Sequence, residues 1–327
     1  MSLITSLRES AAPDVAVELA ANHVSAARLE WRGGEAVVAM HAWEPLPPGA
    51  LVPSFTAANI HDGPAVLAAL ESVLERVGRP RRIGLILPDL VAKVSLVRFE
   101  QVPAKVQELD QLVRWQVRKT APFAIEEAQV SYVPGLRAPD GQEFVVSLAR
   151  RDIVQEYERH CAAAGAHAGI VDLSTFNVIN AVMAGTGAPL ADWLLVNIAA
   201  DFTSIALLRG PHLIFFRNRA VDTEGTLADL VHQTAMYYED RLKGGGFARV
   251  ILAGASAADG ELDRGQPGAE IDHIRRNLEE RLKTPVESID PRTAAALTDR
   301  IGAAPALLDA LAPLVGLLLR DRKGVAA

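Results

Sequence analysis

The chain of 327 residues has a single cysteine, Cys161, and fewer basic than acidic residues, so its formal net charge is −7 and its pI is near 5.7. One cysteine excludes a disulfide within the chain and fits a reducing compartment. The acidic balance gives no electrostatic case for binding nucleic acid. We therefore expect a cytoplasmic protein whose partners are not nucleic acids.

The sequence also lacks the segments that export a protein or hold it in a membrane. The N-terminal stretch MSLITSLRES has no charged region followed by an apolar one, so we expect no secretory signal. The most apolar late stretch, PALLDALAPLVGLLLR, is too short to span a bilayer and contains Pro313. A composition that is 50% hydrophobic at this length is enough for two compact soluble lobes.

Motifs of common catalytic and metal sites are missing as well. The sequence contains no G-x4-GK[ST] phosphate loop, no HExxH motif and no cluster of cysteine and histidine. The glycine run Gly244–Gly246 precedes an apolar strand instead of a helix, so we interpret it as a helix stop and not as a phosphate loop. The sequence therefore predicts no catalytic residue and no metal site.

The most informative stretch runs from Trp193 to Gly254. Short β-rich runs at 194–198, 204–208 and 213–217, separated by turn residues, predict a three-stranded antiparallel meander. A helical apolar face at 227–242 follows, and the stretch RVILAGAS then predicts a buried strand and a tight turn. Three strands, a helix and a strand in this order form the core of one half of an actin-like fold, in which the first hairpin turn binds phosphate.

A second meander of the same kind is predicted at 15–42, so the chain has a weak internal duplication of lobes. Residues 91–150 interrupt the first lobe with the pattern of a strand, a helix and two strands. The predicted fold class is α/β, an actin-like (ribonuclease H-like) two-lobe fold with a small α+β module inserted in lobe one. The predicted domains are lobe one at 13–90 and 151–187, the module at 91–150, and lobe two at 188–322.

Several stretches, in order from about residue 14 to 322, resemble the PilM family of actin-like, FtsA-like proteins of type IV pilus assembly. The stretches are RWQVRKTAPFAIEEAQVSY, AGAHAGIVDLSTFNVINAV, VILAGAS, RLKTPVESIDP and APLVGLLLR. The resemblance implies a cytoplasmic protein at the inner face of the inner membrane. It also implies a partner, the cytoplasmic tail of a PilN-like membrane protein, besides other pilus assembly components.

The nucleotide turns of that family are altered in this sequence. The first turn loses its glycine, the second turn has an amide and an alanine where the family has aspartate and glycine, and a Gly-Gly pair is Gly-Ala. We take the positions of these degenerate phosphate turns as the candidate cofactor-binding residues. They are Glu18, Ala20, Asn22, Asn197, Ala199, Thr203 and Gly254, of which Thr203 and Gly254 keep the family residue. Without glycine the backbone approaches phosphate less closely.

A connection of about seven residues, Ala220–Thr226, also replaces a subdomain that the family inserts in lobe two. The resemblance thus predicts a pseudo-ATPase that acts as a scaffold and uses no cofactor. If the nucleotide site survives these changes, the cofactor would be ATP with magnesium. The alternative is a nucleotide-binding actin-like ATPase or kinase, for which Asp172 and Asp201 are the candidate carboxylates.

A basic and aromatic stripe lies in the predicted module. We predict as partner-binding residues Arg114, Trp115, Arg118, Lys119 and Phe123. The two arginines are one helical turn apart, and Arg and Trp are frequent anchors of interfaces. The resemblance implies that the groove beside the module takes the extended PilN-like tail, by strand addition or groove docking. In the alternative interpretation the two aromatic residues belong to the module core and the cations are only solvated.

Overall fold

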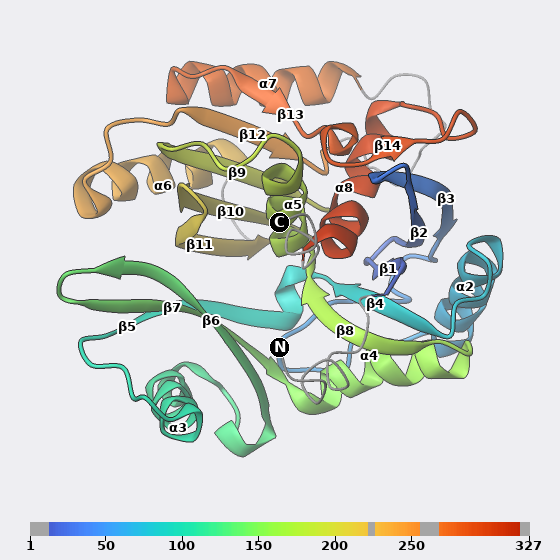
Figure 1. The fold of residues 1–327 in the computed structure, drawn as a ribbon, viewed down its shortest axis with the longest axis horizontal. Coiled ribbons are helices and arrows are strands. Elements are labelled where there is room, and N and C mark those ends of the chain that lie inside the picture. The colour runs from blue at the N-terminus through green and yellow to red at the C-terminus, as the bar shows by residue number, and fades with distance from the viewer. Residues whose placement is uncertain (1–12, 222–225, 256–267, 321–327) are drawn as a thin grey trace.

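The structure is a computed structural model that describes residues 13–221, 226–255 and 268–320. Figure 1 shows two α/β lobes, with lobe two above and lobe one to the right, and a small module at the lower left. No helix in the described ranges is both long and apolar enough to cross a membrane.

Lobe one is built on a six-stranded sheet with the order β14-β3-β2-β1-β4-β8. The strands are β1 (Val15–Leu19), β2 (His23–Arg32), β3 (Glu35–Pro45), β4 (Arg82–Leu87), β8 (His167–Leu173) and β14 (Ala296–Leu297). The first three form an antiparallel meander, and β4 and β8 continue the sheet in parallel with β1. Strand β1 is buried on both faces, as its uninterrupted VAVEL sequence indicates.

Two pairs of helices cover this sheet. Helices α2 (Gly63–Arg76) and α4 (Arg151–Ala163) pack on one face, with Leu70 and Tyr157 in their shared core. Helices α5 (Ser174–Gly185) and α8 (Pro305–Leu319) pack together between the sheets of the two lobes. The core of lobe one is thus divided by β1 into two apolar layers.

The C-terminal part of the predicted lobe two belongs with lobe one. Lobe two was predicted over 188–322, but β14 pairs with β3, and α8 packs against β1, β2 and α5. The 3-10 helix η4 (Pro291–Thr293) also contacts α5 and α8. Helix α8 is buried along almost its whole length, because it is apolar on all sides and needs partners all round.

Lobe two repeats the strand pattern in a five-stranded sheet with the order β11-β10-β9-β12-β13. Its strands are β9 (Asp192–Ile198), β10 (Phe202–Arg209), β11 (His212–Ala220), β12 (Arg249–Ala253) and β13 (Val286–Ser288). Helices α6 (Leu227–Leu242) and α7 (Gly268–Leu282) pack on the sheet face that points away from α5. The two meanders therefore have the same connectivity, each followed by a parallel strand beside its first strand.

The end of α6 shows why glycine follows it. Lys243 takes the left-handed conformation with φ 54°, so the helix stops one residue before the glycine run. A Cβ on Gly244 would lie 1.9 Å from Cζ of Tyr238. The first glycine is required because the backbone there passes directly over a buried tyrosine ring.

The module has its own three-stranded antiparallel sheet with the order β5-β7-β6. Its elements are β5 (Ala92–Phe99), α3 (Val106–Val117), β6 (Ala128–Ala138), β7 (Gly141–Arg150) and the 3-10 helices η2 (Arg118–Thr120) and η3 (Ile125–Glu127). Helix α3 covers one face of this sheet, and the 3-10 helix η1 (Asp89–Val91) joins β4 to β5. The other face points towards lobe two and β8 (Figure 1).

Candidate functional site

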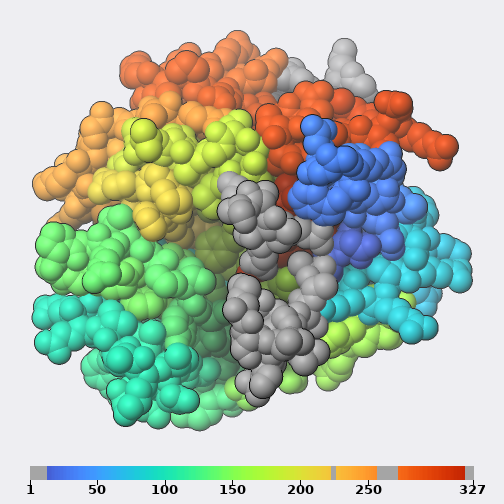
Figure 2. Space-filling view, in the orientation of Figure 1, coloured from blue at the N-terminus to red at the C-terminus, as the bar shows by residue number. Residues whose placement is uncertain are grey.

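A cavity of about 740 Å³ lies where the module meets both lobes. Strands β6 and β7 form one wall, β8 and α4 of lobe one form another, and the β10–β11 hairpin of lobe two closes a third side. The surface is hollowed between the module and the rest of the chain (Figure 2). The module, lobe one and lobe two are therefore all needed to build this cavity.

The module wall follows from the two-residue period of its strands. Alternate residues of β6 and β7 face the cavity, and they are Gln129, Ser131, Val133, Val145, Ser147 and Ala149. The residues between them, such as Val130 and Val146, are buried beneath α3. The cavity side of the sheet therefore carries small or polar side chains, which leave room for a bound segment.

Two terminal strands line the cavity. Strand β8 is the last strand of the lobe-one sheet, and β6 is the last strand of the module sheet. A terminal strand presents N–H and C=O groups on its outer side that its own sheet does not pair. An extended chain in the cavity can therefore be bound through its backbone as well as through its side chains.

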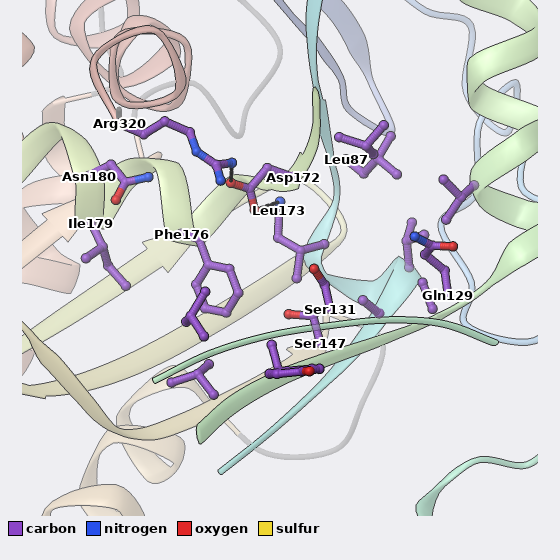
Figure 3. A pocket seen from close by; sticks show the side chains of 18 of the residues that line it. Leu87, Gln129, Ser131, Ser147, Asp172, Leu173, Phe176, Ile179, Asn180 and Arg320 are labelled. Carbon is purple, nitrogen blue, oxygen red and sulfur yellow. Dashed lines mark hydrogen bonds and ion pairs between the residues drawn. The ribbon is translucent and has the colours of Figure 1, made fainter. Parts of the chain in front are cut away.

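The remaining lining is apolar in the middle and charged at its end. Phe176 lies in the middle, and the ion pair between Asp172 and Arg320, at 2.6 Å, lies at one end (Figure 3). From α4, Arg151 and Glu158 add charges of both signs. A mostly apolar pocket with a few placed polar groups is typical of a binding site.

The predicted nucleotide turns lie elsewhere, between the lobes. They form a small cavity of about 50 Å³, and its lining includes Glu18, Ala20, Asn22, Asn197, Ala199 and Gly254. Thr203 is buried but does not line it. The turns thus come together as the fold class predicts, but the space between them is well below the roughly 300 Å³ of a small ligand site.

Close packing of the turns explains the small volume. Gly254 has φ +77°, and a Cβ there would lie 2.0 Å from the carbonyl oxygen of Ile198. Asp309 and Pro313 of α8 line the same cavity. The turn after β12 therefore rests directly on the second nucleotide turn, and α8 lines another side of the cavity.

Buried carboxyl groups gather around these turns. Glu18 accepts a hydrogen bond from Ser174 Oγ at 2.8 Å, and burial raises its pKa to about 7. Burial also raises the pKa of Asp201 to about 6. Two carboxyl groups whose pKa values are raised by burial therefore lie beside the nucleotide turns.

Asp89 is a third buried carboxylate in this region. It accepts hydrogen bonds from the backbone N–H of Thr175 at 3.1 Å and from the hydroxyls of Thr175 and Ser204. Asn197 Nδ2 donates to Thr175 Oγ1 at 2.8 Å. Burial raises the pKa of Asp89, while these donors lower it. Side chains of the two lobes thus bond directly to each other beside the nucleotide turns.

Metal ligation finds no support in the described ranges, where no group of three or more His, Cys, Asp or Glu residues is arranged around one point. Of the two carboxylates considered for an ATPase, Asp172 is paired with Arg320 at the larger cavity. Asp201 lies at the turn between β9 and β10. The structure therefore does not bring these two side chains together as a pair.

The predicted partner-binding stripe lies on the other side of the module from the 740 Å³ cavity. Trp115 is 57% exposed, so it is not a core residue, and Arg114 pairs with Asp110 at 2.8 Å. Arg118 and Lys119 are exposed on η2. Phe123 is half-buried, with its ring 5.1 Å from that of Phe55.

Sequence reasoning missed the cavity wall of β6 and β7. The signal was present, because Ser131 and Ser147 each alternate with apolar residues in QVSYV and VVSLA. That pattern marks a strand with one polar face, but it does not say that another body covers this face.

Two lobes with matching meanders, an inserted module and turns that meet between the lobes define a protein of the actin-like ATPase fold. The family model of the type IV pilus assembly protein PilM matches residues 16–241. The chain therefore belongs to the PilM family.

Three solved structures are similar to this chain to different degrees. The chain is similar to one from the PilM–PilN type IV pilus biogenesis complex, at 18% identity and a TM-score of 0.77, over 94% of this chain and 99% of that one. A Bacteroides thetaiotaomicron protein with an actin-like ATPase fold and unknown function matches at 9% identity and a TM-score of 0.48, over 84% and 90%. The cytoplasmic domain of EpsL, from the type II secretion system of Vibrio cholerae, matches at 13% and 0.44, over 73% and 80%.

Proposed function

We propose that this protein is a non-catalytic scaffold of the inner-membrane assembly platform of a type IV pilus or a related secretion machine. It acts in the cytoplasm at the inner face of the membrane and binds the cytoplasmic tail of a PilN-like membrane protein. Membership of the PilM family and the likeness to a protein solved in complex with PilN support this proposal.

The observation that carries the proposal is the 740 Å³ cavity between two terminal strands. An extended tail pairs its backbone with β6 or β8 and places alternate side chains in the apolar middle of the cavity. Ser131, Ser147 and Gln129 offer hydrogen bonds along the module wall. Backbone pairing supplies affinity, and the side-chain pockets supply specificity.

No ATP is used in this proposal. The small volume between the nucleotide turns and the contact of Gly254 with Ile198 support this view. Calorimetry with ATP and magnesium should then detect nothing tighter than millimolar binding, about −4 kcal/mol. Micromolar binding, or nucleotide that copurifies, would instead favour the alternative, an actin-like ATPase or kinase.

The tail site is tested with a synthetic peptide of the cytoplasmic tail of a PilN-like protein. Ser147→Trp fills the cavity and should weaken peptide binding by about tenfold or more, measured by fluorescence anisotropy. Glu71→Trp adds the same ring at an exposed position of α2, outside both candidate sites, and is the matched control.

The stripe on α3 stays the alternative location of the tail site, and the same assay separates the two. Arg114→Ala and Arg118→Ala should leave binding unchanged if the tail lies in the cavity. If they weaken it by about tenfold while Ser147→Trp does not, the tail binds α3, where an interfacial Arg often contributes about 2 kcal/mol.

A further inference from the structure

Asp89 stands where the module, lobe one and lobe two meet. It begins η1, the connection from β4 of lobe one into β5 of the module, and it is fully buried. Its carboxylate accepts hydrogen bonds from Thr175, at the start of α5, and from Ser204 of β10. Its carbonyl oxygen accepts a hydrogen bond from Asn218 Nδ2 of β11 at 2.9 Å. Asp89 is therefore hydrogen-bonded to both lobes and begins the connection into the module.

These bonds hold the Asp89 carboxyl group in a defined place. The first turn of α5 donates a backbone N–H to it, and the hydroxyls of Thr175 and Ser204 donate as well. Hydrogen bonds are directional, so together they fix the position of the group. The apolar contacts between α5 and lobe two also hold the lobes together, but apolar burial does not specify one orientation.

The residues next to this network line the tail cavity. Leu87 and Val91 flank Asp89 in sequence, Phe176 follows Thr175, and Leu208 follows Ser204 on the same strand. A rotation of one body against another would therefore move a cavity wall. Two lobes of one chain can usually move relative to each other. Here the buried hydrogen bonds around Asp89 restrict that motion.

The geometry points to Asp89 as a positioning residue of the tail site, which holds the module and the two lobes in the one arrangement that forms the cavity. This inference rests on the proposed function. Hydrogen bonds between side chains of this protein join the two lobes. They lie beside the turns that bind nucleotide in other proteins of this fold. The cavity is therefore formed without a nucleotide.

The test compares Asp89→Asn and Ser204→Ala with Tyr238→Phe as control. Tyr238 makes buried hydrogen bonds only within lobe two, to Asp192 at 2.9 Å and to the Gly246 carbonyl at 3.0 Å. If the network holds the competent arrangement, its loss lowers the fraction of molecules that can bind. Both network variants should then bind the tail peptide about threefold to tenfold more weakly, and Tyr238→Phe should bind it like the wild type.

A second readout reports the arrangement itself. Spin labels on cysteines at Glu71, Gln107 and Glu239, taken in pairs, place probes on exposed helix positions of lobe one, the module and lobe two. Cys161 is buried, so it does not compete for the label. The wild type should give narrow distance distributions by pulsed electron resonance. The network variants should give broader ones that narrow again with saturating peptide.

Unchanged peptide affinity and unchanged distances in both network variants would overturn the inference. If the wild type itself does not bind the peptide, the proposed function fails instead, and the two failures are distinguishable. If Asp89→Asn does not fold, Ser204→Ala and Asn218→Ala decide the result, because each removes one donor from lobe two and leaves the carboxylate bonded to Thr175.

Discussion

Replacing Glu18 by glutamine should change how the stability of this protein depends on pH. Glu18 is 8% exposed, and its pKa in the folded chain is about 7 against an ordinary value of 4.5. The folded protein therefore holds a proton between these values that the unfolded chain releases. The stability contributed by this group is fully present below pH 4.5 and is lost as pH rises through 7.

The size of the effect follows from the pKa shift. Each pKa unit corresponds to about 1.4 kcal/mol, so the buried carboxyl lowers the free energy of unfolding at pH 8 by at most about 3 kcal/mol. Glutamine cannot ionise, and its amide oxygen can still accept from Ser174. Glu18→Gln should thus be close to wild type in stability at pH 4.5 and more stable at pH 8.

Two buried histidines act on both proteins alike and cancel in the comparison. His23 and His41 have pKa values lowered by burial to about 4, so the stability that they contribute is present above pH 6.5 and is lost as pH falls through 4. Asp89 and Asp201 repel the ionised Glu18, so the difference between variant and wild type reports Glu18 together with this repulsion.

Urea denaturation at several pH values between 4.5 and 8 measures this difference. A difference between the two proteins that stays constant over this range would refute the argument, since Glu18 would then be ionised at neutral pH. Magnesium and ATP provide the functional readout. If they raise the melting temperature of the wild type but not of Glu18→Gln, Glu18 serves a nucleotide site, and the non-catalytic scaffold is contradicted.

Three further substitutions test the packing. Gly316→Ala should lower the free energy of unfolding by about 3 kcal/mol, measured in urea, because its Cβ would lie 1.7 Å from the carbonyl oxygen of Asn177 and backbone cannot move aside. Tyr238→Phe should cost about 1 kcal/mol through the lost hydrogen bond to Asp192, and an unchanged unfolding midpoint would contradict that bond. Trp115→Ala should leave the melting temperature within about 1 °C, since the ring is exposed; unfolding of the module would instead make it a core residue.

Local sequence pattern was enough to predict most elements of this fold. The alternation and turn residues around Trp193 predict the β9–β11 meander. The glycines after α6 mark its end, although the cap itself is Lys243 in the left-handed conformation. These features depend on neighbouring residues, whose period and backbone freedom can be read along the chain.

The functional surfaces were decided by tertiary structure. Ser204 and Asp89 are 115 positions apart, and Ser174 and Glu18 are 156 apart, yet each pair is hydrogen-bonded in the buried region between the lobes. Helix α8 is apolar on all sides, so its sequence specifies burial without naming the sheet that covers it. The altered turns are visible in the sequence, but the closure of their cavity and the opening of the larger one depend on which non-local surfaces pack together.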